Sequence, residues 1–554
     1  MRTEMKTRMV ATTGLTALMF LSNAAIALRA EHAGATAQHA MVATAQHDAT
    51  QVGVDILQAG GNAVDAAVAV GYALAVTGPC CGNIGGGGFM LIRLHDGRER
   101  FIDFRERAPL RATATMYLDA RGNVEPNASL RGWLAVAVPG TVAGLETARR
   151  EFGTMSRERL IAPAVALARD GFVLTAGDEL LPDGKTPAPG TRFRQLQLAR
   201  TLELIAKDGP GAFYQGPIAR TIVAASRANG GILTMDDFAS YRVEEAPPLH
   251  CSFDGYEIIG APPPSSGGVT LCEILNIIAP YPLARWGRHD AMSIHYVTEA
   301  ERLAYADRNA YLGDPDFVHD PVAQLLAPEY AARLRAKIKP ERATLSANVH
   351  PGLSISAREG ADTTHYSIVD RWGNAVAVTY TINDSFGADV EAGNAGFFLN
   401  DEMDDFTSKP GVPNLYGLVQ GSQNAIAPGK RPLSSMAPTI VTRDGKLAMV
   451  TGSPGGSRII TIVLETLLNA LVYGMDAQAA VDAPRTHMQW LPDLLQYEPG
   501  ALSGATSQRL AQMGYALRQF PPWGSAQAIV IDPATGVLEG GSDRRTPVGS
   551  VQGY

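Results

Sequence analysis

Apolar residues recur along the chain with two different periods, and the alternation between them predicts where helices and strands lie. Residues 48–76 favour two helices separated at Gly60-Gly61, and the second is small or apolar on nearly every side, so we expect it to be buried. Residues 89–104 show the alternation of a β-hairpin. From about 141 to 345 the pattern is mainly helical, most clearly over 291–311, where an apolar stripe lies opposite charged side chains.

A polar, weakly patterned segment is followed by a series of predicted strands in the second half of the chain. Residues 345–362 are polar and weakly patterned, which is typical of an exposed linker. Strand pairs are expected over 365–382, 439–451 and 528–539, and an apolar helix over 458–473. Strand pairs with helices outside them predict sheets packed between helical layers.

The first residues have the layout of a secretory signal. Arg2, Lys6 and Arg8 are followed by a mostly apolar stretch over 9–21 and by the small residues of Ala25-Ile26-Ala27. We expect residues 1–27 to be removed. The apolar stretch is too short for a membrane span, and no later stretch reaches about 18 uninterrupted apolar residues. The expected product is an exported protein, periplasmic or secreted, without a membrane span after signal removal.

Composition narrows the possible functions. The chain has 47 Lys+Arg against 55 Asp+Glu, a formal net charge of −8, and no long basic run, so nucleic acid is not an expected partner. Hydrophobic residues make up 46%, which excludes a wholly disordered chain. Glycine is frequent, at 57 of 554 residues, and it gathers in short loops instead of repeating with a fixed period.

Four cysteines, Cys80, Cys81, Cys251 and Cys272, are too few for a disulfide framework in so long a chain. Adjacent Cys80 and Cys81 are not expected to bond to each other. No C-x-x-C pair indicates a zinc or thioredoxin-type site. We therefore expect small buried side chains, and the sequence leaves their pairing open.

Most common catalytic motifs are absent from the sequence. It contains no H-E-x-x-H, G-x-S-x-G or S-x-x-K. Gly184-Lys185-Thr186 imitates the end of a phosphate-binding loop, but Glu179 stands where that loop needs its first glycine. His295 and Glu299 lie one helical turn apart, a spacing more typical of a solvated helix face than of a metal site. No metal or organic cofactor is expected.

The junction at Asp362-Thr363 remains as a candidate for chemistry. A threonine hydroxyl is a weak nucleophile, but at a free N-terminus its own α-amino group, with an unperturbed pKa of about 8, can act as the base. This scheme requires a cut immediately before Thr363. An exposed linker that runs into a buried strand beginning with threonine suits it, although many strands simply begin with threonine.

The residues around this junction resemble the γ-glutamyltranspeptidase family, also called γ-glutamyltransferases. Ordered motifs in both halves carry the resemblance, which covers everything beyond the signal segment. The motifs are Thr363-Thr364-His365-Tyr366-Ser367, residues 373–379, Met403-Asp404-Asp405-Phe406, residues 431–436, residues 452–458, residues 82–89, Asp103-Phe104-Arg105-Glu106, residues 262–268 and residues 313–317.

The resemblance implies one precursor that cuts itself into two subunits. The cut would fall between Asp362 and Thr363, giving a large subunit of residues 28–362 and a small catalytic subunit of residues 363–554 that together form a heterodimer. The implied fold is the N-terminal nucleophile hydrolase αββα four-layer sandwich, in agreement with the layers predicted from the pattern.

The resemblance also implies roles for the catalytic residues. Thr363 would attack the γ-carbonyl of a γ-glutamyl amide such as glutathione and form an acyl-enzyme. Thr381 matches the threonine that supports the nucleophile by hydrogen bonding. Gly455 and Gly456 match the backbone N–H pair that stabilises the oxyanion.

The remaining matched residues would bind the glutamyl part of the substrate. Arg105 matches a clamp for the carboxylate, with Ser434 and Ser435 as its hydroxyl partners, and Asn383, Glu402 and Asp405 match the residues that hold the α-ammonium. Residues 410–421, with Tyr416 near the middle, resemble a lid loop over the pocket.

The expected activity is transfer of the γ-glutamyl group to an amino acid, a peptide or water. A cephalosporin (glutaryl) acylase of the same superfamily is the alternative. Its substrate lacks the α-ammonium, so Glu402 and Asp405 count against it. A third possibility is an exported γ-glutamyl binding protein without turnover, against which Thr363 and the Gly455-Gly456 pair count.

Overall fold

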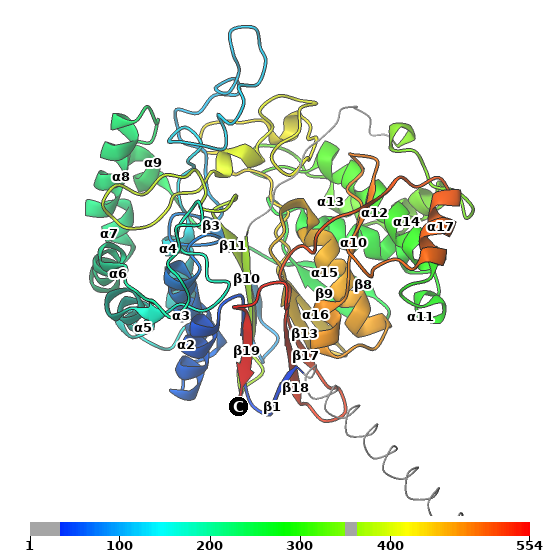
Figure 1. Ribbon diagram of the computed structural model, residues 1–554, viewed down its shortest axis with the longest axis horizontal. Coiled ribbons are helices and arrows are strands. Elements are labelled where there is room, and N and C mark those ends of the chain that lie inside the picture. The colour runs from blue at the N-terminus through cyan, green and yellow to red at the C-terminus, as the bar shows by residue number, and fades with distance from the viewer. Residues whose placement is uncertain (1–33, 350–362) are drawn as a thin grey trace, which may run out of the picture.

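The computed structural model describes residues 34–349 and 363–554. The expected signal segment 1–27, Asp362 and most of the expected linker lie outside the described residues. Two seven-stranded sheets lie between two groups of helices, so the chain forms the expected αββα sandwich (Figure 1).

Neighbouring strands are antiparallel throughout both large sheets. The first sheet has the order β1 (Ala35–Ala37), β18 (Leu538–Ser542), β17 (Gln527–Ile531), β13 (Lys446–Gly452), β12 (Thr439–Arg443), β9 (Tyr256–Gly260) and β8 (Leu249–Phe253). The second has the order β19 (Ser550–Gly553), β2 (Met41–Thr44), β10 (Thr364–Val369), β11 (Ala375–Thr381), β3 (Gly87–Arg93), β4 (Glu99–Asp103) and β7 (Glu244–Ala246). The hairpins expected over 89–104, 365–382, 439–451 and 528–539 are therefore confirmed.

Alternate side chains of the second sheet enter two different cores. On β11, Ala375 and Ala377 belong to the core shared with the first sheet, whereas Val376 and Val378 belong to the core beneath the neighbouring helices. Successive side chains of a strand point to opposite faces, which explains this division. Both faces of β11 are buried, and the strand is apolar from Ala375 to Val378 before the polar Thr379 and Thr381 near the site.

Helices cover the outer face of each sheet (Figure 1). One group consists of α2 (His47–Gln58), α3 (Ala63–Thr77), α4 (Thr141–Phe152), α5 (Arg157–Asp170), α6 (Leu196–Asp208), α7 (Pro210–Tyr214), α8 (Pro217–Ala228) and α9 (Met235–Ser240). The other consists of α10 (Gly267–Ile278), α11 (Leu283–Trp286), α12 (Ala291–Tyr311), α13 (Val322–Leu325), α14 (Pro328–Arg335), α15 (Ile459–Leu467), α16 (Ala477–Asp482) and α17 (Gly504–Gln512). Two small sheets, β5 (Phe172–Val173) with β6 (Arg192–Phe193) and β14 (Thr486–His487) with β15 (Leu495–Tyr497) and β16 (Leu517–Gln519), complete the described fold.

Helix α3 is buried along its whole length, as the small and apolar residues of its sequence predict. The Asn62 side chain accepts a hydrogen bond from the backbone of Asp65, and the Asp65 side chain accepts one from the backbone of Asn62. This reciprocal cap satisfies backbone donors that would otherwise be unpaired at the start of a buried helix. The helix ends at Thr77, just before the loop that reaches the candidate site.

Helix α12 has the expected bounds but not the expected exposure. Its charged residues are predicted to face solvent, whereas Glu301, Arg302 and Arg308 are buried. The helix is enclosed by neighbouring elements, and its two buried arginines, Arg302 and Arg308, donate to polar side chains inside the protein. Neither α12 nor any other helix in the described ranges is long and apolar enough to cross a membrane.

The cysteines form two disulfides, Cys80–Cys81 and Cys251–Cys272. The expectation that adjacent Cys80 and Cys81 would not bond to each other is therefore wrong. The expectation assumes side chains that point apart, as in an extended strand. Here the backbone N–H of Cys81 donates to the carbonyl of Gly78 at 3.3 Å, and this turn brings the two side chains together.

Candidate active site

Thr363 immediately precedes β10, in the interior of a sheet. Thr364 on β10 pairs with Tyr380 on β11, so Thr363 lies opposite Thr381, and the two hydroxyl oxygens are 3.3 Å apart. The backbone N–H of Asn383 donates to the Thr381 hydroxyl at 2.8 Å. This contact fixes the Thr381 hydroxyl beside that of Thr363, the arrangement expected for a residue that supports a nucleophile.

A glycine loop between β13 and α15 supplies Gly455 and Gly456 to the walls of the two cavities that Thr363 also lines. Gly455 has a φ of +142° and Gly456 a φ of +54°, conformations that favour glycine. A β-carbon on Gly456 would come within 2.3 Å of the Tyr416 ring. Backbone N–H groups in such a loop can stabilise the oxyanion that forms when a hydroxyl attacks a carbonyl.

A small cavity beside Thr363 contains nearly all of the residues expected in the site. Only Gly455 and Asp362 are missing from its walls: Gly455 lines a second cavity that also reaches Thr363, and Asp362 lies outside the described residues. The small cavity is lined by Arg105, Thr363, Thr381, Asn383, Glu402, Asp405, Tyr416, Ser434, Ser435, Met436, Gly456 and Ile459.

Arg105 is fully buried and lies among three carboxylates. Its terminal nitrogens donate to Glu402, to Asp405 at 2.5 Å and to Glu106 at 3.4 Å. Burial raises the pKa of Glu106 to about 7 and raises that of Glu402 well above its ordinary value. The cluster thus combines a planar cation with carboxylates that burial discourages from ionising, and it can bind a ligand that carries both signs of charge.

Tyr416, from the loop that is expected to form a lid, lines the small cavity. Its hydroxyl donates to the backbone carbonyl of Asn383 at 3.1 Å and also contacts the Asn383 side-chain oxygen. The Asn383 amide nitrogen donates to Asp401 at 3.1 Å. The Tyr416 carbonyl accepts from the Gln489 side chain at 3.1 Å, which joins the lid to the small sheet region. Tyr416 is only 5% exposed, so this loop packs over the cavity.

Ser434 and Ser435 also line the small cavity, and a buried arginine fixes one of them. Arg308 on α12 donates to the Ser435 hydroxyl at 3.0 Å and to the Ser266 hydroxyl at 2.9 Å. Burial lowers the pKa of Arg308 to about 10. Because the Ser435 oxygen accepts from a guanidinium, its own O–H is directed elsewhere and is available to a ligand carboxylate.

Sequence reasoning missed Arg308 and Glu106. The helical pattern puts Arg308 on the charged side of residues 291–311, and such a position carries no signal of burial. The Asp-Phe-Arg-Glu motif includes Glu106 but suggests no role for it. Within residues 34–349 and 363–554, no group of His, Cys, Asp and Glu side chains is arranged to hold a metal ion.

The model of the gamma-glutamyltranspeptidase family matches residues 49–553. The chain belongs to the γ-glutamyltranspeptidase family. It is 52% identical to a glutathione hydrolase proenzyme of Pseudomonas sp. (strain A14), over 95% of this chain and 96% of that protein. It is 47% identical to a glutathione hydrolase proenzyme of Escherichia coli (strain K12), over 94% of this chain and 92% of that one.

A solved structure supports the same fold. The cephalosporin acylase from Bacillus halodurans superposes with a TM-score of 0.83 at 29% identity, over 94% of this chain and 97% of that one. This member of the γ-glutamyltranspeptidase family therefore has the N-terminal nucleophile hydrolase architecture, and it is an enzyme of the transferase and hydrolase type that the family name describes.

Arg105→Lys should raise the KM for γ-glutamyl donors by roughly tenfold or more and change kcat less. A lysine keeps the positive charge but cannot present two parallel N–H groups to a carboxylate. Steady-state kinetics with γ-glutamyl-p-nitroanilide would measure both constants. Arg443→Lys, at the exposed end of β12, is the matched control. An unchanged KM in Arg105→Lys would remove Arg105 from the binding of the glutamyl group.

Proposed function

We propose that this chain is a self-processing γ-glutamyltransferase that cleaves the γ-glutamyl amide bond of glutathione and related compounds through an acyl-enzyme on Thr363. The observation that carries the proposal is the small cavity in which Thr363 meets a buried, mixed-charge cluster around Arg105. A γ-glutamyl group offers a carboxylate, an ammonium and a carbonyl to such a cavity. Its relatives named as glutathione hydrolase proenzymes support glutathione as a donor.

Processing would cut the chain between Asp362 and Thr363. We infer a large subunit of residues 28–362 and a small subunit of residues 363–554. Strands from the two parts pair with each other within the second sheet, where β2 pairs with β10 and with β19, and β3 pairs with β11. This shared hydrogen bonding supports one entwined heterodimer after the cut.

The proposed reaction begins when the Thr363 hydroxyl attacks the γ-carbonyl carbon. The freed α-amino group of Thr363 takes the hydroxyl proton, and the backbone N–H groups of Gly455 and Gly456 stabilise the negative oxygen. When the amide C–N bond breaks, the proton passes to the leaving amine. An amino acid, a peptide or water then attacks the ester and releases Thr363 for another cycle.

Binding of the glutamyl end of the substrate would change which carboxylates pair with Arg105. In the structure Arg105 contacts Glu402 and Asp405. Glu402 and Asp405 each accept from a different terminal nitrogen through one oxygen, and a substrate carboxylate can replace one of them or accept from both nitrogens. The displaced carboxylate and Asn383 would then face the substrate ammonium, while Ser434 and Ser435 donate to the substrate carboxylate. The exchange keeps every buried charge paired.

The glutaryl acylase activity is supported less well than the γ-glutamyl activity. The likeness to the cephalosporin acylase structure concerns the fold. A glutaryl side chain has no ammonium, so a carboxylate displaced from Arg105 would stay buried without a cation. Leaving a buried charge unpaired is costly, and sites built for a polar group reject analogues that lack it.

The test compares γ-glutamyl-p-nitroanilide with glutaryl-p-nitroanilide on the purified enzyme, after mass spectrometry of its chains. We expect a fragment that begins at Thr363 and a preference for the γ-glutamyl compound of roughly a hundredfold or more in kcat/KM. A preference for the glutaryl compound would favour the acylase. A purified protein that stays as one chain and turns over neither compound would support a binding protein.

We also infer that the enzyme is exported, to the periplasm or outside the cell, and that amino acids and peptides are its acceptors. The signal-like layout over residues 1–27 supports the first inference. The second cavity at Thr363 supports the inference about acceptors. It gives an amino acid or peptide a route to the acyl-enzyme beside the glutamyl cavity.

A further inference from the structure

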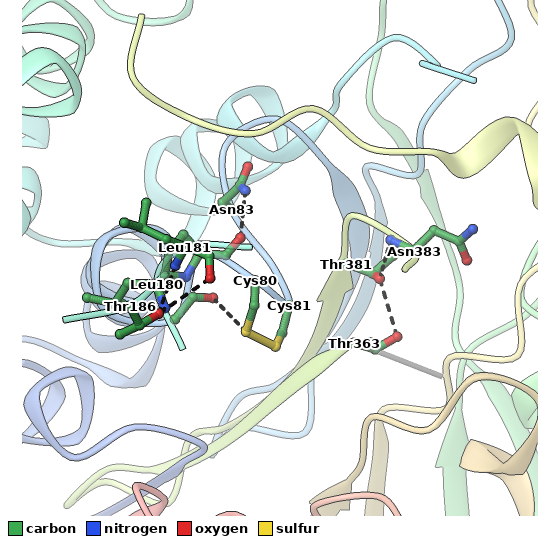
Figure 2. The surroundings of a disulfide bond; sticks show 11 residues. Cys80, Cys81, Asn83, Leu180, Leu181, Thr186, Thr363, Thr381 and Asn383 are labelled. Atoms are coloured by element: carbon green, nitrogen blue, oxygen red, sulfur yellow. Dashed lines mark hydrogen bonds between the residues drawn. A yellow bond between two sulfur atoms is a disulfide. The ribbon is translucent and has the colours of Figure 1, made fainter. Parts of the chain in front are cut away.

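Two cavities meet at Thr363. The small one holds the charged cluster, and the larger one, of about 290 Å³, opens on the other side of the nucleophile. Thr363, Thr364 and Gly455 line the larger cavity together with Cys80 and Cys81. In Figure 2 the Cys80–Cys81 bond lies to one side of Thr363, and Asn383 of the small cavity lies to the other. We call the larger cavity the disulfide cleft.

The loop that carries this disulfide is anchored against the nucleophile strand. The backbone N–H of Phe386 donates to the Cys80 carbonyl at 2.9 Å. Gly82, which directly follows Cys81, lies close to Thr364. A β-carbon on Gly82 would be 2.6 Å from the Thr364 methyl carbon. A rearrangement at Cys81 would therefore act on the residue that directly follows Thr363.

The Cys80–Cys81 bond contributes little to the stability of the fold. A disulfide stabilises mainly by closing a loop in the unfolded chain, and the effect grows with the length of that loop. A disulfide between adjacent residues closes almost no loop in the unfolded chain. Cys251–Cys272 differs, because its partners are 21 residues apart and it joins β8 to α10. Closing a loop of that length stabilises the folded chain appreciably. The adjacent pair is thus better explained by chemistry in the cleft than by stabilisation.

The proposed donor brings a thiol to this cleft. If the glutamyl end of glutathione lies in the small cavity and its γ-carbonyl lies at Thr363, the amine that leaves must lie on the opposite side, in the disulfide cleft. That amine belongs to a cysteine residue, whose thiol is one short side chain away from the scissile nitrogen. The leaving cysteinylglycine is therefore released beside Cys80 and Cys81. This step rests on the proposed function.

We propose that the Cys80–Cys81 disulfide is a thiol-exchange site on the leaving-group side of Thr363, and that cysteinylglycine and thiols of similar size open it. Cys81 is partly exposed, whereas Cys80 is 6% exposed and packs with Ile382 and Phe386. The thiolate of the small molecule attacks the Cys81 sulfur, the S–S bond breaks, and Cys80 leaves as a thiolate that takes up a proton. The product is a mixed disulfide on Cys81.

A second thiol completes the exchange. It attacks the sulfur of the small molecule in the mixed disulfide, which releases a low-molecular-weight disulfide and leaves Cys81 as a thiol. Two thiols are oxidised and one protein disulfide is reduced, so no further reductant is needed. In the intermediate, the attached peptide fills the disulfide cleft and the loop before Gly82 is opened. Both changes slow the departure of further leaving groups.

The experiment incubates the processed enzyme with excess cysteinylglycine, blocks free thiols by alkylation, and maps the cysteine peptides by mass spectrometry. Cysteinylglycine carries no γ-glutamyl group, so exchange is measured independently of turnover. We expect adducts or alkylation at Cys80 and Cys81 at least tenfold above those at Cys251 and Cys272. Hydrolysis of γ-glutamyl-p-nitroanilide by a portion withdrawn before alkylation should fall at least threefold and recover after reoxidation with excess cystine.

Two controls separate exchange in the cleft from general reduction. S-methyl-cysteinylglycine has the same shape without a thiol, and it should produce neither adduct nor a reversible loss of activity. A Cys80→Ala/Cys81→Ala variant should no longer respond to cysteinylglycine, whatever its basal rate, whereas Cys251→Ala/Cys272→Ala should still respond.

Several outcomes would overturn the inference. They are equal modification of the two disulfides, no modification of Cys80 and Cys81, and modification without a change in rate. A failure to hydrolyse γ-glutamyl-p-nitroanilide even before cysteinylglycine is added would count against the proposed function instead, so the two failures are distinguishable.

Discussion

Thr363→Ala should leave the chain uncut before residue 363 and lower turnover of γ-glutamyl donors by about 10⁴-fold or more. One hydroxyl is expected to attack first the carbonyl of Asp362 and later the donor carbonyl, and alanine removes it from both reactions. The Thr381 hydroxyl, 3.3 Å away, is expected to support the nucleophile and not to replace it. Mass spectrometry of the purified chain and hydrolysis of γ-glutamyl-p-nitroanilide would measure the two effects.

Thr363→Ser is the matched control for this prediction. Serine keeps the hydroxyl and loses only the methyl group, so the variant should still cut itself and still turn over substrate, at a lower rate. A Thr363→Ala protein that is uncut yet active would contradict a single nucleophile for both reactions.

Gly456→Ala should lower kcat/KM for γ-glutamyl donors by about a hundredfold. The added β-carbon would lie 2.3 Å from the Tyr416 ring, and alanine disfavours the φ of +54° at this position. Both effects move the backbone N–H that is expected to stabilise the oxyanion, and they push the lid away from Asn383. Steady-state kinetics measures the loss, and the expected change lies mainly in kcat.

Gly445→Ala is a control that carries the backbone strain without the clash. Gly445 lies in the turn between β12 and β13 with a φ of +74°, and a β-carbon there would meet no atom within 4 Å. This variant should be slightly less stable and fully active. Equal losses of activity in the two variants would mean that backbone strain, and not the place of Gly456, causes the effect.

The periods of apolar residues predict most of the fold because they report burial. The strands around residues 365–382 and the buried helix α3 follow directly from them. The same reasoning fails for α12, because the charged residues of an amphipathic pattern normally face water, whereas Glu301 and Arg302 are enclosed by other elements. A period shows which side chains share a face but not what covers that face.

Prediction of the candidate site depends on sequence motifs more than on the periodicity of apolar residues. Thr363, Arg105 and the Gly455-Gly456 pair are separated by long stretches of sequence, and only the resemblance to a family joins them before a structure is available. Arg308 had no motif, and its role follows from one contact, with Ser435. The Cys80–Cys81 bond was missed because a local turn brings the side chains together, and no spacing rule predicts such a turn.

Strand β2 has a consequence for how the mature enzyme can be made. It lies between β10 and β19, so a strand from before the proposed cut is hydrogen-bonded on both edges to strands from after it. In the uncut chain these pairings form within one molecule, where the covalent link keeps the partners at high effective concentration. Two separated chains would have to meet first and then open an existing sheet to insert β2. The precursor would therefore serve as the template for its own assembly, and the cut would remove that template permanently.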